Sequence, residues 1–450
     1  MSRFKLVNLK GDLFASGASF AAQGFIKLLS SLILTRILAP SQYGIIALLM
    51  SIVFIVLMLS DIGFTFSIVR DEYGEQQTFL NTAWTMRIAR AILYAVVIFT
   101  CAPLIARIYG LPILTAPLRV LAVWFLIDGL ESTSFPVATR RKQSRIVMYA
   151  ETAGTAVSAV ITVVICYFTR DFWGMVWGTL AARLTAVAIS HSIYPDIRPR
   201  LGWDRQAVKR LSKYTRIVMP SSMLTLLTQQ FDKAVFVRLF DLPLLGVYSL
   251  AANIAAPILS IIHRVTHMVL YPRCAHNYRE DRNTFSVKYY RENARLFIAI
   301  LAIPALVGGA ARFLVSTLYD PRYAQAAEVL EAFMVRAALS SFTQSAEEML
   351  FAAGENHVLL IGSILRTVFT IAGSLVGYEF FGFTGFVYGI ALHNVPSLIY
   401  FLWLQGRKGL LIPRYELYKV GFVCCVAVSA YAGSRLVMAL SAGLRIKHGV

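Results

Sequence analysis

Thirteen long apolar segments occupy most of the chain, and this pattern limits its possible folds more than any other feature. Each segment has roughly 20 or more residues, the length that an α-helix needs to cross about 30 Å of hydrocarbon. The connections between them are short and carry turn-forming residues such as Pro40, Gly110 and Pro321. The pattern predicts an all-α integral membrane protein with helices at approximately 12–35, 44–67, 80–107, 117–135, 147–168, 172–193, 215–239, 245–271, 294–318, 327–351, 358–380, 384–404 and 416–440.

Composition supports a membrane environment. Of 450 residues, 57% are hydrophobic and only 15% are charged, and the mean hydropathy is +0.64. A soluble domain could not bury so much apolar surface, because a single core stops growing well below this length. The first apolar segment, about Gly11 to Thr35, is too long for a signal-peptide core and has no small-residue cleavage site. We therefore expect it to be retained as the first helix.

The net charge of +19 does not indicate a nucleic-acid partner. The charges cluster in short segments between apolar runs, and they do not have the interleaved aromatic platform that stacks on bases. Neither a disulfide framework nor a metal site is expected, and no cofactor or catalytic residue is predicted. The cysteines have no paired-ligand spacing; they are Cys101, Cys166, Cys274, Cys424 and Cys425.

The basic residues predict the orientation of the chain. With the N-terminus in the cytoplasm, they concentrate on the predicted cytoplasmic side, as the positive-inside rule requires. Outer loops hold little beyond Arg107, Arg170 and Arg322. A thirteenth helix would export Arg445 and Lys447 against the rule, so twelve to fourteen crossings remain open. The cytoplasmic set is Arg3, Lys5, Lys10, Arg140, Arg141, Lys142, Arg145, Arg198, Arg200, Arg205, Lys209, Arg210, Lys213, Arg273, Arg279, Arg282, Lys288, Arg291, Arg407, Lys408, Arg414 and Lys419.

An internal repeat relates the two halves. The segment 34–44 resembles 236–246, and 173–178 resembles 384–389. Each offset contains six predicted helices, so both halves enter from the same side and are expected to be related by a pseudo-two-fold axis along the membrane normal. Two facing bundles suggest alternating access to a cavity at their interface. The expected domains are a six-helix bundle at 1–194, a basic cytoplasmic linker at 195–213, a second six-helix bundle at 214–406, and an additional helix with a tail at 407–450.

The residues from Leu32 to Leu48, LILTRILAPSQYGIIAL, followed by Ser60-Asp-Ile-Gly63, resemble the opening of Wzx-type polysaccharide flippases. These proteins belong to a superfamily that also includes multidrug extruders and the lipid II flippase. The resemblance implies movement of an undecaprenyl-pyrophosphate-linked oligosaccharide from the cytoplasmic to the periplasmic leaflet of a bacterial inner membrane. It also suggests polysaccharide polymerase machinery as a partner. It assigns a role to no individual residue.

Charged side chains inside predicted helices are the candidate site. An ionisable group at membrane depth costs at least ~2.5–3.5 kcal/mol, so it usually faces a cavity or a partner. A cationic lining would suit a pyrophosphate, which arginine binds with a planar fork of donors. The alternative for each residue is a structural ion pair, or a side chain that reaches the headgroups. The candidates are Lys27, Arg183, Gln229, Lys233, Arg264, Arg336 and Arg366.

A second set could carry coupling protons, because a buried carboxylate or imidazole can titrate near neutrality. The alternative, which we favour, is that the acids neutralise nearby arginines and the histidines make local hydrogen bonds. The repeat places Asp61 at the position of His263, and Lys27 at that of Gln229. The set is Asp61, Asp128, Glu131, His191, Asp232, His263 and His393.

Three rival functions remain for comparison. A membrane polymerase or ligase would need a pocket at the outer surface, but the predicted outer loops have only about four to ten residues. A multidrug extruder for lipophilic cations would need acidic groups, whereas the deep charges are mostly basic. A lipid II flippase shares the carrier and its charge, so only the opening motif favours the polysaccharide branch. The sequence contains no phosphate-binding Gly-x-x-x-x-Gly-Lys-Ser/Thr loop, and this argues against an integral ATPase.

Overall fold

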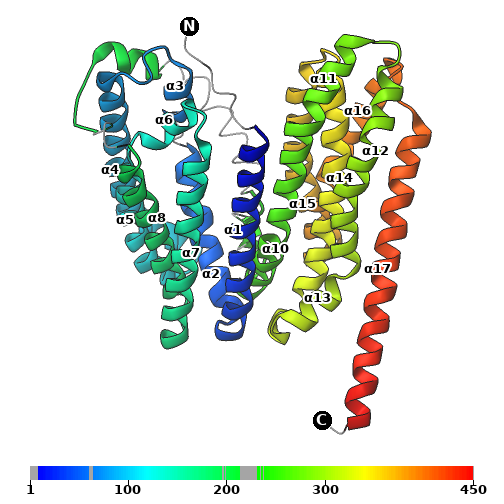
Figure 1. Ribbon diagram of the computed structural model, residues 1–450. Helices are drawn as coiled ribbons and strands as arrows, with labels where there is room; N and C mark the ends of the chain where they lie inside the picture. Colours follow the sequence, from blue (N-terminus) through cyan, green and yellow to red (C-terminus); the bar gives the residue numbers. More distant parts are fainter. Residues whose placement is uncertain are drawn as a thin grey trace. The chain divides into compact units, whose positions relative to one another are not determined.

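The computed structural model describes residues 9–59, 64–194, 197, 199–212, 231–233, 235–236 and 238–448, and within these ranges it contains helices without any strand. The chain divides into two compact units, Met1–Pro243 and Leu244–Val450. Figure 1 shows long, roughly parallel helices in each unit. The predicted all-α class is confirmed. The predicted domain limits and the pseudo-two-fold axis stay predictions.

The first unit is built around the helix pairs α4–α5 and α7–α8, with α1 packed against α7. Its helices, apart from the short 3₁₀ turn η1 (Pro112–Leu114), are α1 (Leu9–Ile37), α2 (Pro40–Leu59), α3 (Phe64–Arg70), α4 (Gln77–Ile108), α5 (Thr115–Gly129), α6 (Ser134–Arg140), α7 (Ser144–Thr169) and α8 (Trp173–Ser192).

The second unit is centred on α14, which contacts α12, α15 and α16, while α17 packs along α12. Its elements are α10 (Leu242–Val265), the π-helical turn η2 (Thr266–Leu270), α11 (Tyr271–Glu280), α12 (Phe285–Gly309), α13 (Ala311–Leu318), η3 (Pro321–Tyr323), α14 (Ala326–Ala352), α15 (His357–Ala391), η4 (Leu392–Asn394), α16 (Val395–Arg407) and α17 (Pro413–His448).

Nine helical stretches of the described chain are long and apolar enough to cross a membrane. One of them, His357–Arg407, contains two predicted helices, while α8 and α14 are present as helices but lie outside this set. The predicted helix 215–239 lies mostly outside the described residues. Large apolar side chains cover the outer surface; Leu93, Phe168 and Phe381 are 58%, 79% and 77% exposed. Such a surface suits lipid, and the protein is a multi-pass membrane protein.

In the described part of the chain, turns divide two of the predicted helices. The expected helix 117–135 ends at Gly129, and the chain turns before α6 begins at Ser134. The turn is held by the Ser132 amide, which donates to Oγ of Ser190 at 3.0 Å. The expected helix 294–318 is likewise divided between α12 and α13 at Ala310. The first break is held by a contact between distant segments, and hydropathy alone does not predict such a contact.

The repeated glycines mark the closest helix contacts. A Cβ on Gly174 or Gly178 of α8 would overlap Cys166 or Thr162 of α7. In the second unit, a Cβ on Gly385 would overlap the backbone of Gly377, and one on Gly389 would overlap that of Gly373. Small residues four apart let helix backbones approach closely in membranes. The repeated segments 173–178 and 384–389 therefore both carry glycines at which two helical segments of the same unit pack closely.

Candidate functional site

A buried charge cluster joins three helices of the first unit. Arg87 of α4 contacts Glu131 at 2.8 Å and Asp128 at 3.6 Å. Arg90, one turn further along α4, lies 3.7 Å from Asp128. Arg183 of α8 contacts both carboxylates. All five side chains are at least 80% shielded from solvent, and three cations against two acids leave one formal positive charge.

Aromatic rings surround this cluster. The Arg90 guanidinium lies 5.2 Å from the Phe64 ring and 5.9 Å from the Tyr94 ring, and that of Arg183 lies 5.6 Å from the Trp124 ring. Such cation–π contacts stabilise a cation that has left water. The sequence identified Arg183, Asp128 and Glu131 but missed Arg87 and Arg90. Their spacing of three residues on one helix was the available signal.

His191 belongs to the edge of this region. Its Nε2 lies 2.8 Å from the carbonyl oxygen of Leu130, in the turn that follows α5. The side chain is exposed. This contact fixes the end of α8 against the turn beside the charge cluster.

A second buried ion pair joins α14 and α15 in the second unit. Arg366 donates from both terminal nitrogens to Glu347, at 3.0 and 3.1 Å, and reaches Ser363 Oγ at 3.3 Å. The adjacent Glu348 lies 2.9 Å from Nδ1 of His267. Glu347 was missed because α14 carries several charges and the sequence does not show which of them faces α15.

Arg336 differs from Arg183 and Arg366. It is half-buried on α14, and it has no hydrogen bond or ion pair among the residues that the structure describes. His393, in the turn η4, is 5% exposed, and its Nδ1 lies 2.7 Å from the carbonyl oxygen of Ile390. The neighbouring Asn394 donates to Ser340 Oγ at 2.9 Å. Arg336 is therefore a cation without a carboxylate partner among the residues that the structure describes, and Ser340 lies four residues further along the same helix.

The remaining candidates lie apart from these groups. Lys27 of α1 is exposed, and no described residue bonds or pairs with it. Arg264 and His263 are also exposed, and the His263 ring stacks on His267 with centroids 6.1 Å apart. Asp232 is buried and accepts from the Lys233 amide at 2.8 Å, while Lys233 itself is half-buried. Asp61 and Gln229 lie outside the described residues.

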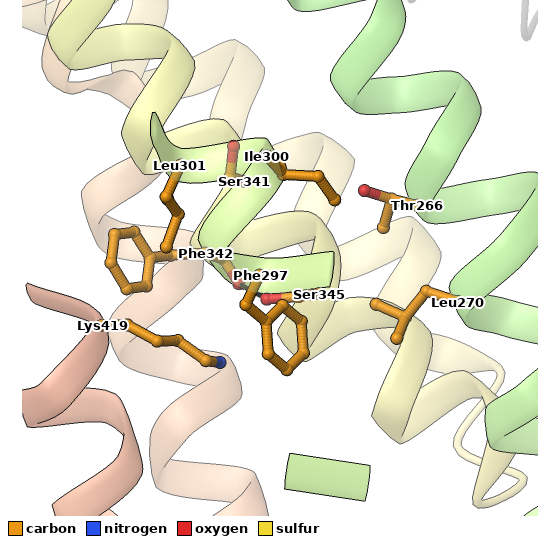
Figure 2. Close-up of a pocket in the computed structure, with 9 residues that line it drawn as sticks. All are labelled: Thr266, Leu270, Phe297, Ile300, Leu301, Ser341, Phe342, Ser345 and Lys419. Carbon is orange, nitrogen blue, oxygen red and sulfur yellow. Dashed lines mark hydrogen bonds between the residues drawn. The ribbon is translucent and has the colours of Figure 1, made fainter. Parts of the chain in front are cut away.

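Lys419 is a buried cation that the sequence placed with the cytoplasmic charges. It lies on α17 at 8% exposure, 2.8 Å from Glu416, with its Nζ 4.0 Å from the centre of the Phe297 ring. Figure 2 shows it beside a small cavity that Ser341 and Ser345 also line. The cavity volume of about 10 Å³ is room for about one water molecule. Lys419 therefore helps to join α17 to α12, and substrate could not enter here.

The comparisons with known proteins agree with this architecture. The chain is 21% identical to the succinoglycan biosynthesis transport protein ExoT of Rhizobium meliloti (strain 1021), covering 86% of this chain and 79% of that protein. It is 20% identical to the lipopolysaccharide biosynthesis protein WzxC of Escherichia coli (strain K12), covering 86% and 78%.

Two solved structures share the fold. The lipid II flippase MurJ in an inward closed conformation has a TM-score of 0.72 at 11% identity, covering 95% of this chain and 93% of that one. An inward-facing multidrug resistance MATE family transporter of the MOP superfamily has a TM-score of 0.68 at 17% identity, covering 86% and 95%. A family model described as "Polysaccharide biosynthesis protein" matches residues 33–328, more than half of the chain. The chain belongs to this polysaccharide biosynthesis protein family.

Proposed function

We propose that this protein moves an undecaprenyl-pyrophosphate-linked oligosaccharide from the cytoplasmic to the periplasmic leaflet of a bacterial inner membrane, with its N-terminus in the cytoplasm. Membership of the family and the similarity to ExoT, a transport protein by name, support this proposal. The protein would act by alternating access, as a transporter without an enzymatic step. Polysaccharide polymerase machinery is the expected partner.

The observation that carries the proposal is the difference between paired and unpaired cations. Arg183 and Arg366 are bound to carboxylates, whereas Lys27 and Arg336 have no such partner in the described chain. A cation that is left unpaired in a membrane protein is costly unless a ligand or water meets its charge. A pyrophosphate is a multivalent anion that could do so, because arginine offers it a fork of donors and lysine a mobile point charge.

The paired residues receive a structural role in this proposal. Arg183 and Arg366 hold α8 and α15 to neighbouring helices, while Asp128, Glu131 and Glu347 neutralise them. Proton coupling through Asp128 or His393 is then secondary. If these two residues coupled transport to protons, reconstituted transport would depend on the pH gradient or on the membrane potential. We expect that transport depends on neither of them.

Complementation tests the proposal. Cells that lack their own polysaccharide flippase would receive the wild-type protein or a Lys27→Ala or Arg336→Ala variant, and surface polysaccharide would be stained. Wild type should restore staining. Either variant should abolish it at an unchanged protein level, because a cation that meets the pyrophosphate is lost.

The control and the rivals use the same cells. Arg312 is exposed and paired with Glu331 at 3.0 Å, so Arg312→Ala removes an equal charge at small cost and should leave export intact. Normal export by both Lys27→Ala and Arg336→Ala would reject the proposed site. Survival of cells depleted of their peptidoglycan flippase, without restored polysaccharide, would identify a lipid II flippase instead.

A further inference from the structure

A separate cavity of about 560 Å³ lies at one end of the first unit. It is formed where α1 passes into α2, where α4 passes through η1 into α5, and where α7 passes into α8. Figure 1 shows these three connections at the end of the unit where α1 finishes. Its volume lies within the ~300–1,000 Å³ that small-molecule sites usually occupy. In the proposed orientation this end faces the periplasm.

The polar wall of the cavity is held in place by Gln42. Its Oε1 accepts from the Ala39 amide at 3.2 Å, and its Nε2 donates to the carbonyl oxygen of Arg170 at 3.1 Å. Asp171 lies beside it and accepts from the Phe172 amide at 2.6 Å through Oδ1. Among the described residues, Oδ2 of Asp171 has no partner, so one carboxylate oxygen remains to accept a hydroxyl group.

Aromatic and apolar side chains form the other wall of the cavity. Trp173 lines the cavity and stacks on Phe172, with ring centroids 5.7 Å apart and planes at 20°. Ile45, Pro112 and Ile113 extend this surface. A sugar ring has C–H groups on its faces and hydroxyl groups at its edge, so it fits a site with one apolar wall and one polar wall.

The charge of the site favours an anion. Arg119 of α5 lines the cavity, and within the described chain its guanidinium has no hydrogen bond or ion pair, only the Phe99 ring at 5.2 Å. The helices α2, α5 and α8 all begin beside the cavity, and each contributes the positive end of its dipole. Among the described residues, Asp171 is the single acidic residue that lines it. A guanidinium fork binds a carboxylate with two parallel hydrogen bonds.

We propose that this cavity binds a carboxylate-bearing sugar residue of the oligosaccharide on the outer side of the membrane. Arg119 binds the carboxylate, Asp171 accepts from ring hydroxyl groups, and Trp173 packs against the ring face. The inference rests on the proposed function for its cargo, but it concerns a site in which neither Lys27 nor Arg336 takes part. It gives the motif residue Gln42 a role, because Gln42 joins the two turns that form the polar wall.

Direct binding tests the site. Purified full-length protein in lipid nanodiscs would be titrated with digalacturonate, with the neutral disaccharide digalactose and with inorganic phosphate, and binding followed by calorimetry. Digalacturonate should bind more tightly than the other two probes. Arg119→Gln should weaken digalacturonate binding at least about tenfold, because a charge-assisted contact is lost.

Arg107→Gln is the matched control. Arg107 is another exposed arginine near the same end of the unit, and it does not line the cavity, so digalacturonate binding should be unchanged. Equal binding by wild type and Arg119→Gln, or binding of phosphate as tight as that of digalacturonate, would overturn the site. The complementation experiment tests the proposed function separately, because the proposed function fails if the wild-type protein does not restore surface polysaccharide.

Discussion

Arg336 and Arg366 show at the scale of single residues how structure separates groups that the sequence treats alike. Both are arginines inside predicted helices, and from the sequence we predicted that both bind the pyrophosphate. Arg366 is bound by Glu347, whereas Arg336 has no carboxylate partner among the described residues. Which charges pair depends on contacts between distant segments, so the sequence could identify the deep charges but not their partners.

The Arg366–Glu347 pair gives a stability prediction. Arg366→Ala should lower the free energy of unfolding by ~3–5 kcal/mol, because a buried carboxylate is left uncompensated. The double variant Arg366→Met with Glu347→Leu should recover most of that loss, since no unpaired charge remains. Thermal melting of the purified protein in detergent would measure both. Equal melting temperatures for wild type and Arg366→Ala would show that the pair does not contribute.

Among the elements, the sequence predicted most helices but not their interruptions. The predicted helix 80–107 corresponds to α4 (Gln77–Ile108), because an apolar run of this length is sufficient to define it. The break after α5 could not be predicted, since it depends on the hydrogen bond from the Ser132 amide to Oγ of Ser190 in α8. Lys419 shows the same limit: its place near a helix start suggested a loop charge, but aromatic residues of α12 surround it.

Helix packing at the repeated glycines gives a matched pair of variants. Gly385→Ala should destabilise the protein, because its Cβ would overlap the backbone at Gly377. Gly421→Ala in α17 should be neutral or slightly stabilising, because no atom lies within 4 Å of the new Cβ and alanine favours the helix by ~1 kcal/mol. Melting temperatures in detergent would compare them. A Gly385→Ala variant as stable as Gly421→Ala would contradict the close contact.

For the whole molecule, composition and apolar periodicity predicted an all-α membrane protein, and residues 32–48 indicated the family that the family model confirms. The relation between the two units was predicted from an even number of helices and stays a prediction. Hydropathy contains no information on how two helical bundles pack, so the sequence alone could not go further than this expectation.

The central claim is that cations without a carboxylate partner meet the charge of a lipid-linked pyrophosphate during transit. It is tested most directly by flipping in proteoliposomes that contain a labelled undecaprenyl-pyrophosphate-linked oligosaccharide, with lectin binding outside the vesicle as the measurement. We predict that wild type and Arg312→Ala expose the sugar to lectin, while Arg336→Ala, folded and equally incorporated, does not. If Arg336→Ala and Lys27→Ala both exposed as much sugar to the lectin as the wild-type protein does, the account would be contradicted.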